Sequence, residues 1–466
     1  MRDALCWRGE SIAHRVRSYR VACGFKLMGV HGMFGYYFDL AQRSLRRNPV
    51  LTALMVLAIG LGIGASMTML TVLHVMSGNP LPERSAQLFY PQLDPQGIED
   101  YRKGEDPPTQ LTWIDAMNLL NARKGIHQAA MSGGQVTVRP AQGDHRAFYV
   151  DARFTTADFF AMFDVPFVRG GGWSSSDDDK QARVVVLAKT LADKLYGEGQ
   201  AVGKILRLGQ NDFRIVGVIE PWSPVPHFYD LTSGGYQDGE QVFMPLSTAL
   251  ALHQGIGGSL ECWGYMSFDS LDRKTAPCSW VQFWVQLDTP ARQQAYREFL
   301  VSYSQQQKIL GRFMRPPNTR LHDLMGWLDY NKVVPGSVQL QTLLALGFLL
   351  VCLVNTVALL LVKFLRRGGE MGVRRAMGAS MRSIFAQLLA EAALVGLCGG
   401  VVGVLLTLFG LWVVRQQPAQ YAGLAHLDAP MLYATFVLAL CTTVLAAMFP
   451  AWRACRLPPA RALKIQ

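Results

Sequence analysis

The sequence predicts an α-helical membrane protein with four transmembrane helices and a large α+β extracytoplasmic domain inserted between the first and second helices. Half of its 466 residues are hydrophobic, yet the mean hydropathy is only +0.15. Four long stretches are almost free of charge, and one long segment between the first two alternates strand and helix patterns. This combination indicates a few membrane spans around a sizeable water-exposed domain.

The four uncharged stretches are long enough to cross a bilayer as helices, because about 20 apolar residues span about 30 Å of hydrocarbon. Glu391 is the only charged residue within them. The first stretch is much longer than the apolar core of about 7–15 residues in a secretory signal peptide, so we interpret it as a retained anchor. The predicted spans are residues 50–76, 339–362, 384–414 and 430–452.

Basic residues gather in three segments, and short cytoplasmic segments carry the excess of positive charge in membrane proteins. Residues 1–49 carry +6, residues 363–383 carry +5 and residues 453–466 carry +4, which leaves −4 for the rest of a chain with a net charge of +11. We therefore expect both termini and the 363–383 link in the cytoplasm. Residues 77–338 and the short loop 415–429 then lie on the outer side of the membrane. The slightly acidic outer segment argues against binding to nucleic acid.

The outer segment shows mixed strand and helix signals. Residues 183–197 predict a buried strand that leads into an amphipathic helix. Residues 204–220 predict a hairpin with its turn at Gln210–Asp212. Residues 280–287 predict another strand, and Pro290 opens a helix that runs towards Lys308.

Two polar features of the outer segment, a run of three aspartates and a pair of cysteines, each allow a functional and a purely structural interpretation. Asp177–Asp179 are three adjacent carboxylates without the ligand spacing of a calcium loop, so we expect a solvated loop. Cys262 and Cys278 are the only cysteines in this segment. An exported pair is a disulfide candidate, and two free buried thiols are the alternative.

Motifs for catalysis and for cofactor binding are absent from the sequence. It contains no GxxxxGK[ST] phosphate loop, no HExxH, no GxSxG and no CxxC. The histidines lack metal-ligand spacing. We therefore expect a non-enzymatic chain without its own cofactor, metal or ATPase activity.

Glycine pairs at a spacing of four mark two of the spans, and such pairs let helix backbones approach closely in lipid. One pair lies in the first span and two overlapping pairs lie in the third. The alternative is that glycine is simply common in membrane helices. The pairs predict close helix packing, within one chain or between two, at Gly60 with Gly64, Gly396 with Gly400, and Gly399 with Gly403.

Glu391 is a charge inside a predicted span, which is costly unless it is paired. It follows Arg382 by about 13 Å of helix at 1.5 Å per residue, which places it near the cytoplasmic interface. We expect a buried structural tie and not a proton relay. Asn355, in the second span, is its possible buried polar partner.

The link between the second and third spans has the pattern of a short amphipathic helix beneath the membrane. Glu370 and Arg374 form an i, i+4 ion pair in the favourable order. Gly378 suits a helix C′ position, and Ser380 suits the N-cap of the next helix. The alternative is an ordinary positive loop.

Several stretches resemble the MacB-type and FtsX-like permeases of ATP-binding-cassette systems. Their C-terminal membrane domain is similar to RRGGEMGVRRAMGAS and IFAQLLAEAALVGLCGGVVG, within 366–403, and to FPAWRACRLPPARALK, 449–464. Their extracytoplasmic core domain is similar to DFFAMFDVPFVRGGGW, 158–173, and to VVLAKTLADKLYG, 185–197. Their entry helix and first span are similar to DLAQRSLRRNPVLTALMVLAIGLGIGA, 39–65.

The resemblance implies a bacterial inner membrane, with the segments on its outer side in the periplasm. It also implies a permease subunit that couples ATP hydrolysis to export of periplasmic cargo by mechanotransmission. It implies a separate cytoplasmic ATPase, which carries the ATP and Mg²⁺, a second permease chain in a homodimer or heterodimer, and a periplasmic adaptor as a further candidate partner. An amphipathic entry helix is expected over residues 33–49. The ATPase would dock on the link helix, through Glu370, Met371, Val373, Arg374, Arg375, Met377 and Gly378.

The sequence also allows other functions and a later start site. An FtsX-like subunit that signals to a periplasmic partner, such as a cell-wall hydrolase, and transports nothing is the alternative function, and a membrane-anchored enzyme is a third. Residues 1–32 match nothing in the family, and we expect Met33 to be the true start.

Overall fold

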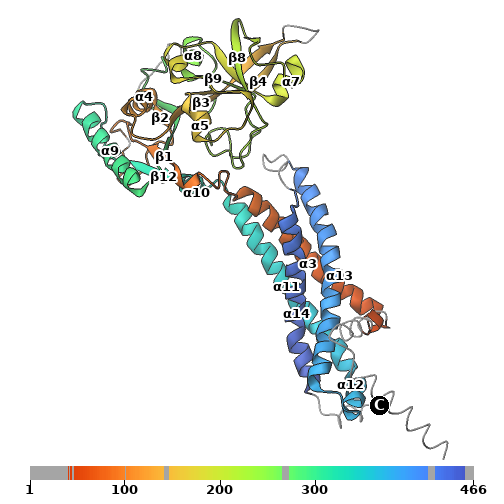
Figure 1. The fold of residues 1–466 in the computed structure, drawn as a ribbon. Helices are drawn as coiled ribbons and strands as arrows, with labels where there is room; N and C mark the ends of the chain where they lie inside the picture. The colour runs from red at the N-terminus through yellow and green to blue at the C-terminus, as the bar shows by residue number, and fades with distance from the viewer. Residues whose placement is uncertain are drawn as a thin grey trace, which may run out of the picture. The chain divides into compact units, whose positions relative to one another are not determined.

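The computed structural model describes residues 40, 42–44, 47–99, 101–140, 146–264, 272–417 and 426–456. They form two compact units, one from the residues before 74 and after 336, and one from residues 74–336 (Figure 1). The predicted extension 1–32 and most of the predicted entry helix 33–49 lie outside the described residues. So do most of the loop 415–429 and of the tail 453–466.

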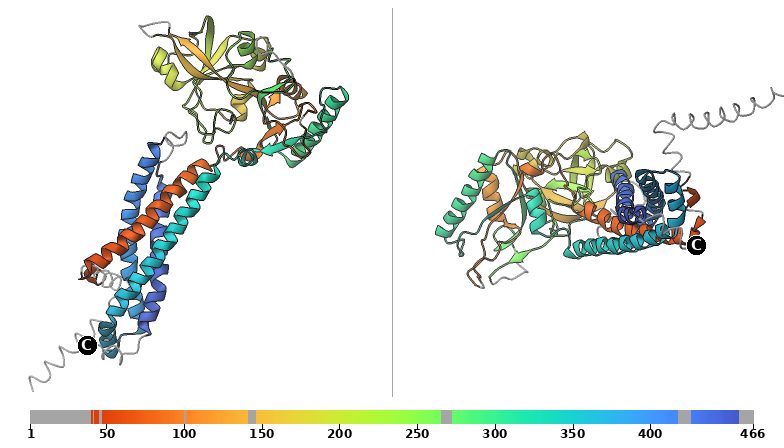
Figure 2. Two further views of the ribbon diagram at one scale, coloured as in Figure 1. Left: turned by 180° about the vertical axis from the view of Figure 1, so that it is seen from behind. Right: turned by 90° about the horizontal axis from the view of Figure 1, so that it is seen from below.

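The first unit is a bundle of long helices with one short helix (Figure 2). Four of its helices are long enough and apolar enough to cross a membrane, which confirms the four predicted spans. Each helix extends past the predicted bounds, by one residue at one end of the first span and by one to four residues at each end of the others. The helices are α3 (Pro49–Met76), α11 (Gly336–Arg366), α13 (Met381–Arg415) and α14 (Ala429–Cys455), with the short α12 (Gly368–Ala376) between α11 and α13.

The second unit is an α+β domain built on one mixed sheet. Among the described residues, the strand order is β12-β1-β11-β3-β4-β9-β6-β8-β5, with β2, β7 and β10 attached beside it. The β4–β9 and β6–β8 pairs are parallel and the other pairs are antiparallel. The main strands are β1 (Leu88–Gln92), β3 (Gln128–Arg139), β4 (Phe148–Thr155), β5 (Phe167–Gly170), β6 (Val184–Ala188), β8 (Asn211–Ile219), β9 (Val242–Pro245), β11 (Cys278–Gln286) and β12 (Arg320–Asp323), and the attached strands are β2 (Leu111–Thr112), β7 (Ile205–Leu208) and β10 (Glu261–Cys262).

Side chains on the two faces of this sheet form two separate hydrophobic cores, because successive residues of a strand point to opposite faces. In β11, Phe283 and Val285 belong to one core and Trp284 to the other. In β6, Val185 and Leu187 likewise oppose Val184, Val186 and Ala188. Such strands are buried on both faces, which is why β6 is a continuous apolar run in the sequence.

Helices surround the sheet, and those named here are at most 10 residues long except for α9, which has 20. They are α4 (Trp113–Ala122), α5 (Asp158–Met162), α6 (Ser175–Asp179), α7 (Lys189–Tyr196), α8 (Leu246–Ala251), α9 (Pro290–Ile309) and α10 (Leu324–Tyr330), with a 3-10 turn at Ser85–Gln87. Together with the four spans, this domain confirms the predicted fold class. The predicted strand and helix at 183–197 are β6 and α7, and the predicted helix from Pro290 is α9.

Two local predictions were wrong. The hairpin at 204–220 forms, but its two-residue turn is Gly209–Gln210, because Leu208 pairs with Asn211 and Gly209 takes a φ of +60°. The expected loop at Asp177–Asp179 belongs to α6, whose capping box links Ser174 and Asp177. Asp178 accepts hydrogen bonds from the Ala157 backbone N–H and the Trp173 indole N–H, both at 2.8 Å.

Candidate functional site: the link helix and its buried anchor

The predicted link helix is present as α12. The Arg374 guanidinium donates to the Glu370 carboxylate at 3.0 Å, as the i, i+4 spacing predicted. The helix covers residues 368–376, and Met377 and Gly378, the last two residues expected to contact the ATPase, form the turn that ends it. Gly378 takes a φ of +98°, and the Ser380 hydroxyl accepts from the Ser383 N–H to cap α13.

Apolar residues of α12 and of the turn that ends it face in two directions. Met371 packs against the core of the helix bundle, and Gly372 is buried. Val373 and Met377 are 46% and 76% exposed, respectively. The helix thus has one side fixed to the bundle and one side that presents apolar groups to its surroundings.

Glu391 is the anchor of a buried polar cluster at the α12 end of the bundle. Its carboxylate is 1% exposed, and it lies 2.5 Å from the Lys363 ammonium at the end of α11, which is equally buried. Arg367, just before α12, donates to the same carboxylate at 3.0 Å. The Ser44 hydroxyl, before α3, also donates to it. A carboxylate with two cations and a hydroxyl is a satisfied group, which suits the expected structural tie.

Asn355, the expected partner of Glu391, does not contact it. Its side chain is on the exposed surface of α11. The buried face of α11 includes Cys352, Thr356 and Lys363, and Asn355 is one residue, about 100° of helix, away from Thr356. The expectation that Asn355 is buried was therefore wrong.

Further polar contacts tie α12 to the other helices. Arg374 donates to the Gln387 amide oxygen on α13 at 3.0 Å. Arg375 donates to the Cys455 carbonyl at the end of α14 at 3.2 Å. Arg47, which precedes α3, lies 3.7 Å from the Glu370 carboxylate. All four long helices, or the segments next to them, therefore contact α12 or the Glu391 cluster.

The predicted glycine pairs lie at helix contacts within the chain. A Cβ on Gly60 would meet Val402 at 2.6 Å, and one on Gly64 would meet Leu406 at the same distance. In return, Gly399 and Gly403 of α13 lie against Ile59 and Ile63 of α3. The pair Gly396 and Gly400 faces α14 instead, against Thr443 and Ala439.

The second unit, residues 74–336, is called the outer domain below. It contains the candidate disulfide. Cys262 and Cys278 are bonded in the structure, and their Cα atoms are 4.1 Å apart. They are directly opposite partners in the β10–β11 ladder. The bond joins the short edge strand β10 to a central strand.

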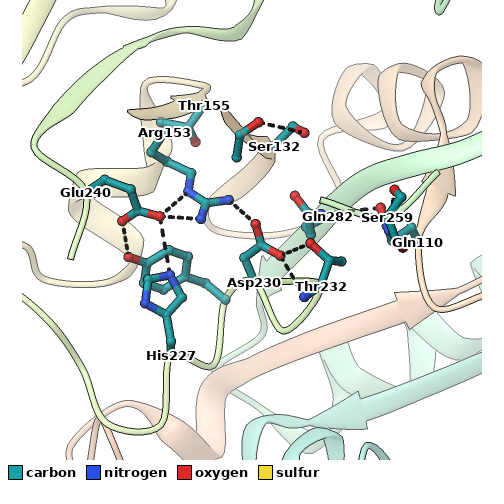
Figure 3. Close-up of polar contacts among 12 residues, drawn as sticks. Gln110, Ser132, Arg153, Thr155, His227, Asp230, Thr232, Glu240, Ser259 and Gln282 are labelled. Carbon is teal, nitrogen blue, oxygen red and sulfur yellow. Dashed lines mark hydrogen bonds and ion pairs between the residues drawn. The ribbon is translucent and has the colours of Figure 1, made fainter. Parts of the chain in front are cut away.

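A buried ionic cluster in the outer domain was not anticipated from the sequence. The Arg153 guanidinium donates to Asp230 at 2.6 Å and to Glu240, and all three side chains are at most 6% exposed (Figure 3). His227 lies 3.3 Å from Glu240. Burial alone would lower the pKa of Arg153, but the charges of Glu240 and Asp230 outweigh it and raise that pKa. Although burial opposes it, Arg153 lowers the pKa values of Asp230 and Glu240.

Comparisons with known proteins match both units. Residues 52–302, more than half of the chain, match the model of the MacB-like periplasmic core domain. The chain belongs to the MacB-like permease family. Residues 342–459 also match the FtsX-like permease C-terminal domain, a range that includes α12, Lys363 and Glu391.

Curated relatives of this MacB-like permease are named as export proteins. The macrolide export ATP-binding/permease protein MacB of Marinobacter nauticus is 26% identical over 427 residues, which cover 91% of this chain and 60% of the relative. The pyoverdine export ATP-binding/permease protein PvdT of Pseudomonas entomophila is 24% identical over 437 residues, which cover 91% of this chain and 58% of the relative. The chain thus spans about 60% of the length of such relatives.

Among solved structures, the periplasmic region of MacB from Actinobacillus actinomycetemcomitans aligns with a TM-score of 0.33 and 13% identity. The alignment covers 52% of this MacB-like permease and 92% of that chain.

Proposed function

We propose that this chain is the permease subunit of an ATP-binding-cassette export system, in which α12 docks a separate cytoplasmic ATPase. The observation that carries the proposal is the arrangement of α12. One side is tied to the helix bundle through Met371 and the Arg374–Gln387 hydrogen bond. The other side exposes Val373 and Met377, which suits an apolar contact with a partner protein.

The contacts of α12 suggest how force would reach the outer domain. A push on α12 acts on α13 through Gln387 and on α14 through the Cys455 carbonyl. Lys363 and Arg367, at the two sides of the α11–α12 junction, both pair with Glu391 on α13 and so link α12 to α11 and α13. The outer ends of α3 and α11 lead directly into the outer domain along the chain. Transmission of force along this path therefore requires that Glu391, Lys363 and Arg367 move together as a rigid group.

The proposed setting is a bacterial inner membrane, with the termini and α12 in the cytoplasm and the outer domain in the periplasm. The proposed assembly contains a second permease chain, and a periplasmic adaptor is a further candidate. Relatives named for macrolide and pyoverdine export make efflux of a periplasmic small molecule the favoured activity.

Docking is tested by co-purification of the tagged full-length chain with an ATP-binding-cassette ATPase. The variant Val373→Asp/Met377→Asp places two carboxylates on the exposed side of α12 and leaves its ion pairs intact. Loss of the ATPase from this variant is the expected result. The matched control is Ile309→Asp, an equally apolar and 85% exposed position in the outer domain. Retention of the ATPase by the double variant would refute docking on α12.

Export is tested separately from docking. A strain without the gene is compared with a strain that carries it, with a macrolide and a pyoverdine as probe compounds. Faster loss of either compound from the periplasm in the complemented strain supports export. The FtsX-like signalling function replaces export if the complex with the ATPase forms, neither probe compound is lost faster from the periplasm, and a cell-wall phenotype depends on the gene.

A further inference from the structure

Asn355 is a polar residue within a membrane span that faces away from its own helix bundle. It lies on the exposed surface of α11. Its amide has no hydrogen-bond partner among the described residues. Thr342 and Thr356, on the same helix, each donate instead to the carbonyl four residues earlier, at 2.8 Å. The chain therefore satisfies the neighbouring polar side chains of α11 and leaves Asn355 unsatisfied.

Asn355 lies too deep in the span to reach water. It precedes Lys363 by eight residues, which is about 12 Å of helix, and the predicted span continues on its other side to residue 339, about 24 Å away. An asparagine side chain cannot reach over such distances, unlike the long side chains of lysine and arginine. An amide without a hydrogen-bond partner in hydrocarbon costs free energy, so Asn355 favours contact with a polar group of another molecule.

A continuous stripe of exposed residues runs along α11 through Asn355. Its members recur at alternating spacings of four and three residues, which is the heptad pattern of two helices that pack along their length. Lipid covers apolar side chains equally well, so only Asn355 indicates a protein partner on this stripe. The Asn355 stripe consists of Leu344, Phe348, Val351, Asn355, Ala358 and Val362, all of them exposed.

The burial of the spans leaves room for a partner at α11. In its most apolar stretch, 22% of the residues are buried, against 28%, 39% and 44% in the other three spans of the described part of the chain. The buried face of α11 includes Cys352 and Thr356, which lie outside the Asn355 stripe. A second helix on the stripe therefore displaces no contact of α11 within its own bundle.

A second copy of this chain fits the Asn355 stripe. Two copies in one membrane share the same topology, so their α11 helices run parallel. A two-fold axis along the membrane normal then brings each residue of the stripe to its own equivalent. An asparagine amide both donates and accepts hydrogen bonds. Two Asn355 amides can thus bond to each other, as a single asparagine at the seam does in parallel two-stranded coiled coils.

We propose that α11 pairs with α11 of a second copy of this chain through the Asn355 stripe, with the two Asn355 amides hydrogen-bonded across the two-fold axis. The inference rests on the proposed function, which includes a second permease chain, and it assigns the identity and the contact surface of that chain. A chain with an apolar residue at this place is disfavoured, because it leaves Asn355 unpaired. The contact needs no ATPase, since it uses no residue of α12.

The test measures self-association of the full-length chain in phosphatidylcholine vesicles without an ATPase. A donor or an acceptor fluorescent protein is fused to the C-terminus, and energy transfer is followed as added lipid dilutes the chain. Asn355→Leu removes the amide and keeps an apolar surface, whereas Asn355→Gln keeps an amide. We expect a dissociation constant about 3- to 30-fold higher for Asn355→Leu and a smaller change for Asn355→Gln. Equal dissociation constants for the wild type and Asn355→Leu would overturn the proposal.

A pair of bulky variants locates the contact on the helix. Ala358→Trp places a large ring within the Asn355 stripe. Leu350→Trp places the same ring at a 62% exposed position that lies about 140° around the helix from Asn355. We expect loss of energy transfer in Ala358→Trp and an unchanged dissociation constant in Leu350→Trp. An effect of Leu350→Trp as large as that of Ala358→Trp would also overturn the proposal, because the copies would then meet through another face.

The failure of this inference is distinguishable from the failure of the proposed function. Dimers that form equally well in Asn355→Leu and Ala358→Trp would overturn the Asn355 stripe and leave the proposed second permease chain in place. A wild-type chain without energy transfer at any lipid ratio would overturn the self-pairing. Docking of the ATPase on α12 is judged independently, by the co-purification experiment.

Discussion

The Lys363 ammonium lies 2.5 Å from the Glu391 carboxylate, and both side chains are 1% exposed. The two residues are on α11 and α13, so this pair joins two of the four long helices at the end of the bundle where α12 lies. Removal of one partner leaves the other buried charge poorly compensated, which typically costs about 3–5 kcal/mol.

The first prediction concerns this pair. Glu391→Gln should lower the free energy of unfolding by about 3–5 kcal/mol. The double variant Lys363→Met/Glu391→Leu should lose less, because it leaves neither charge unpaired and Arg367 keeps Glu370 as a partner at 3.6 Å. Thermal unfolding of the detergent-solubilised chain measures both, with Lys103→Met at an exposed position as the control. A double variant less stable than Glu391→Gln would contradict the structure.

The second prediction concerns the glycine contacts between α3 and α13. Gly60→Ala places a methyl group 2.6 Å from Val402, and overpacking of this kind costs about 1–3 kcal/mol. Gly347→Ala in α11 meets nothing within 4 Å and should be neutral or slightly stabilising. The same unfolding measurement compares the two variants. Equal midpoints would show that α3 and α13 do not pack through Gly60.

The third prediction concerns the disulfide. Replacement of Cys262 and Cys278 by alanine should destabilise the outer domain by about 3 kcal/mol, because the bond closes a loop with a sequence separation of 16. The free cysteines Cys398 and Cys441 provide the control pair. Urea unfolding of the full-length variants measures the effect. Non-reducing peptide mapping that finds both thiols free in the purified full-length protein would refute the bond itself.

The fourth prediction concerns pH. Burial raises the pKa of the Asp178 carboxyl from 3.8 to about 6. The folded chain therefore holds this proton to a higher pH than the unfolded chain, and the resulting stability is present below pH 3.8 and is lost as the pH rises through about 6.

Asp178→Asn does not titrate, and the opposing contributions of Asp230 and Glu240 are common to both proteins. The unfolding free energy of the wild type minus that of the variant should thus fall across this window, by up to about 3 kcal/mol. Urea unfolding at a series of pH values, followed by tryptophan fluorescence, measures this difference. A difference that stays constant or rises with pH would show that Asp178 is not a carboxyl with a raised pKa.

The sequence predicted those features that depend on local patterns. Apolar runs defined four spans, and the i, i+4 spacing of Glu370 and Arg374 defined α12. A pattern of apolar residues alone does not show which side of a helix faces its neighbours. Asn355 was therefore assigned to the wrong face of α11, although the buried positions Cys352 and Thr356 are spaced as a helix face requires.

Contacts between distant residues could not be predicted in this way. Ser44 and Glu391 are 347 positions apart, and Arg153 is 77 positions from Asp230. Lys363 was counted as part of a positive link, and its burial became evident only from the helix packing. A charge next to the end of a span, opposite a charge within another span, is the one sequence signal that could have suggested this pair.

The central claim is that α12 receives the force of an ATPase. Its most direct test is the rate of ATP hydrolysis by the ATPase when it is mixed with the permease in nanodiscs, relative to the rate of the ATPase alone. The account predicts that Val373→Asp/Met377→Asp lowers the rate to that of the isolated ATPase while the unfolding midpoint of the permease is unchanged. Full stimulation by this variant would contradict the account.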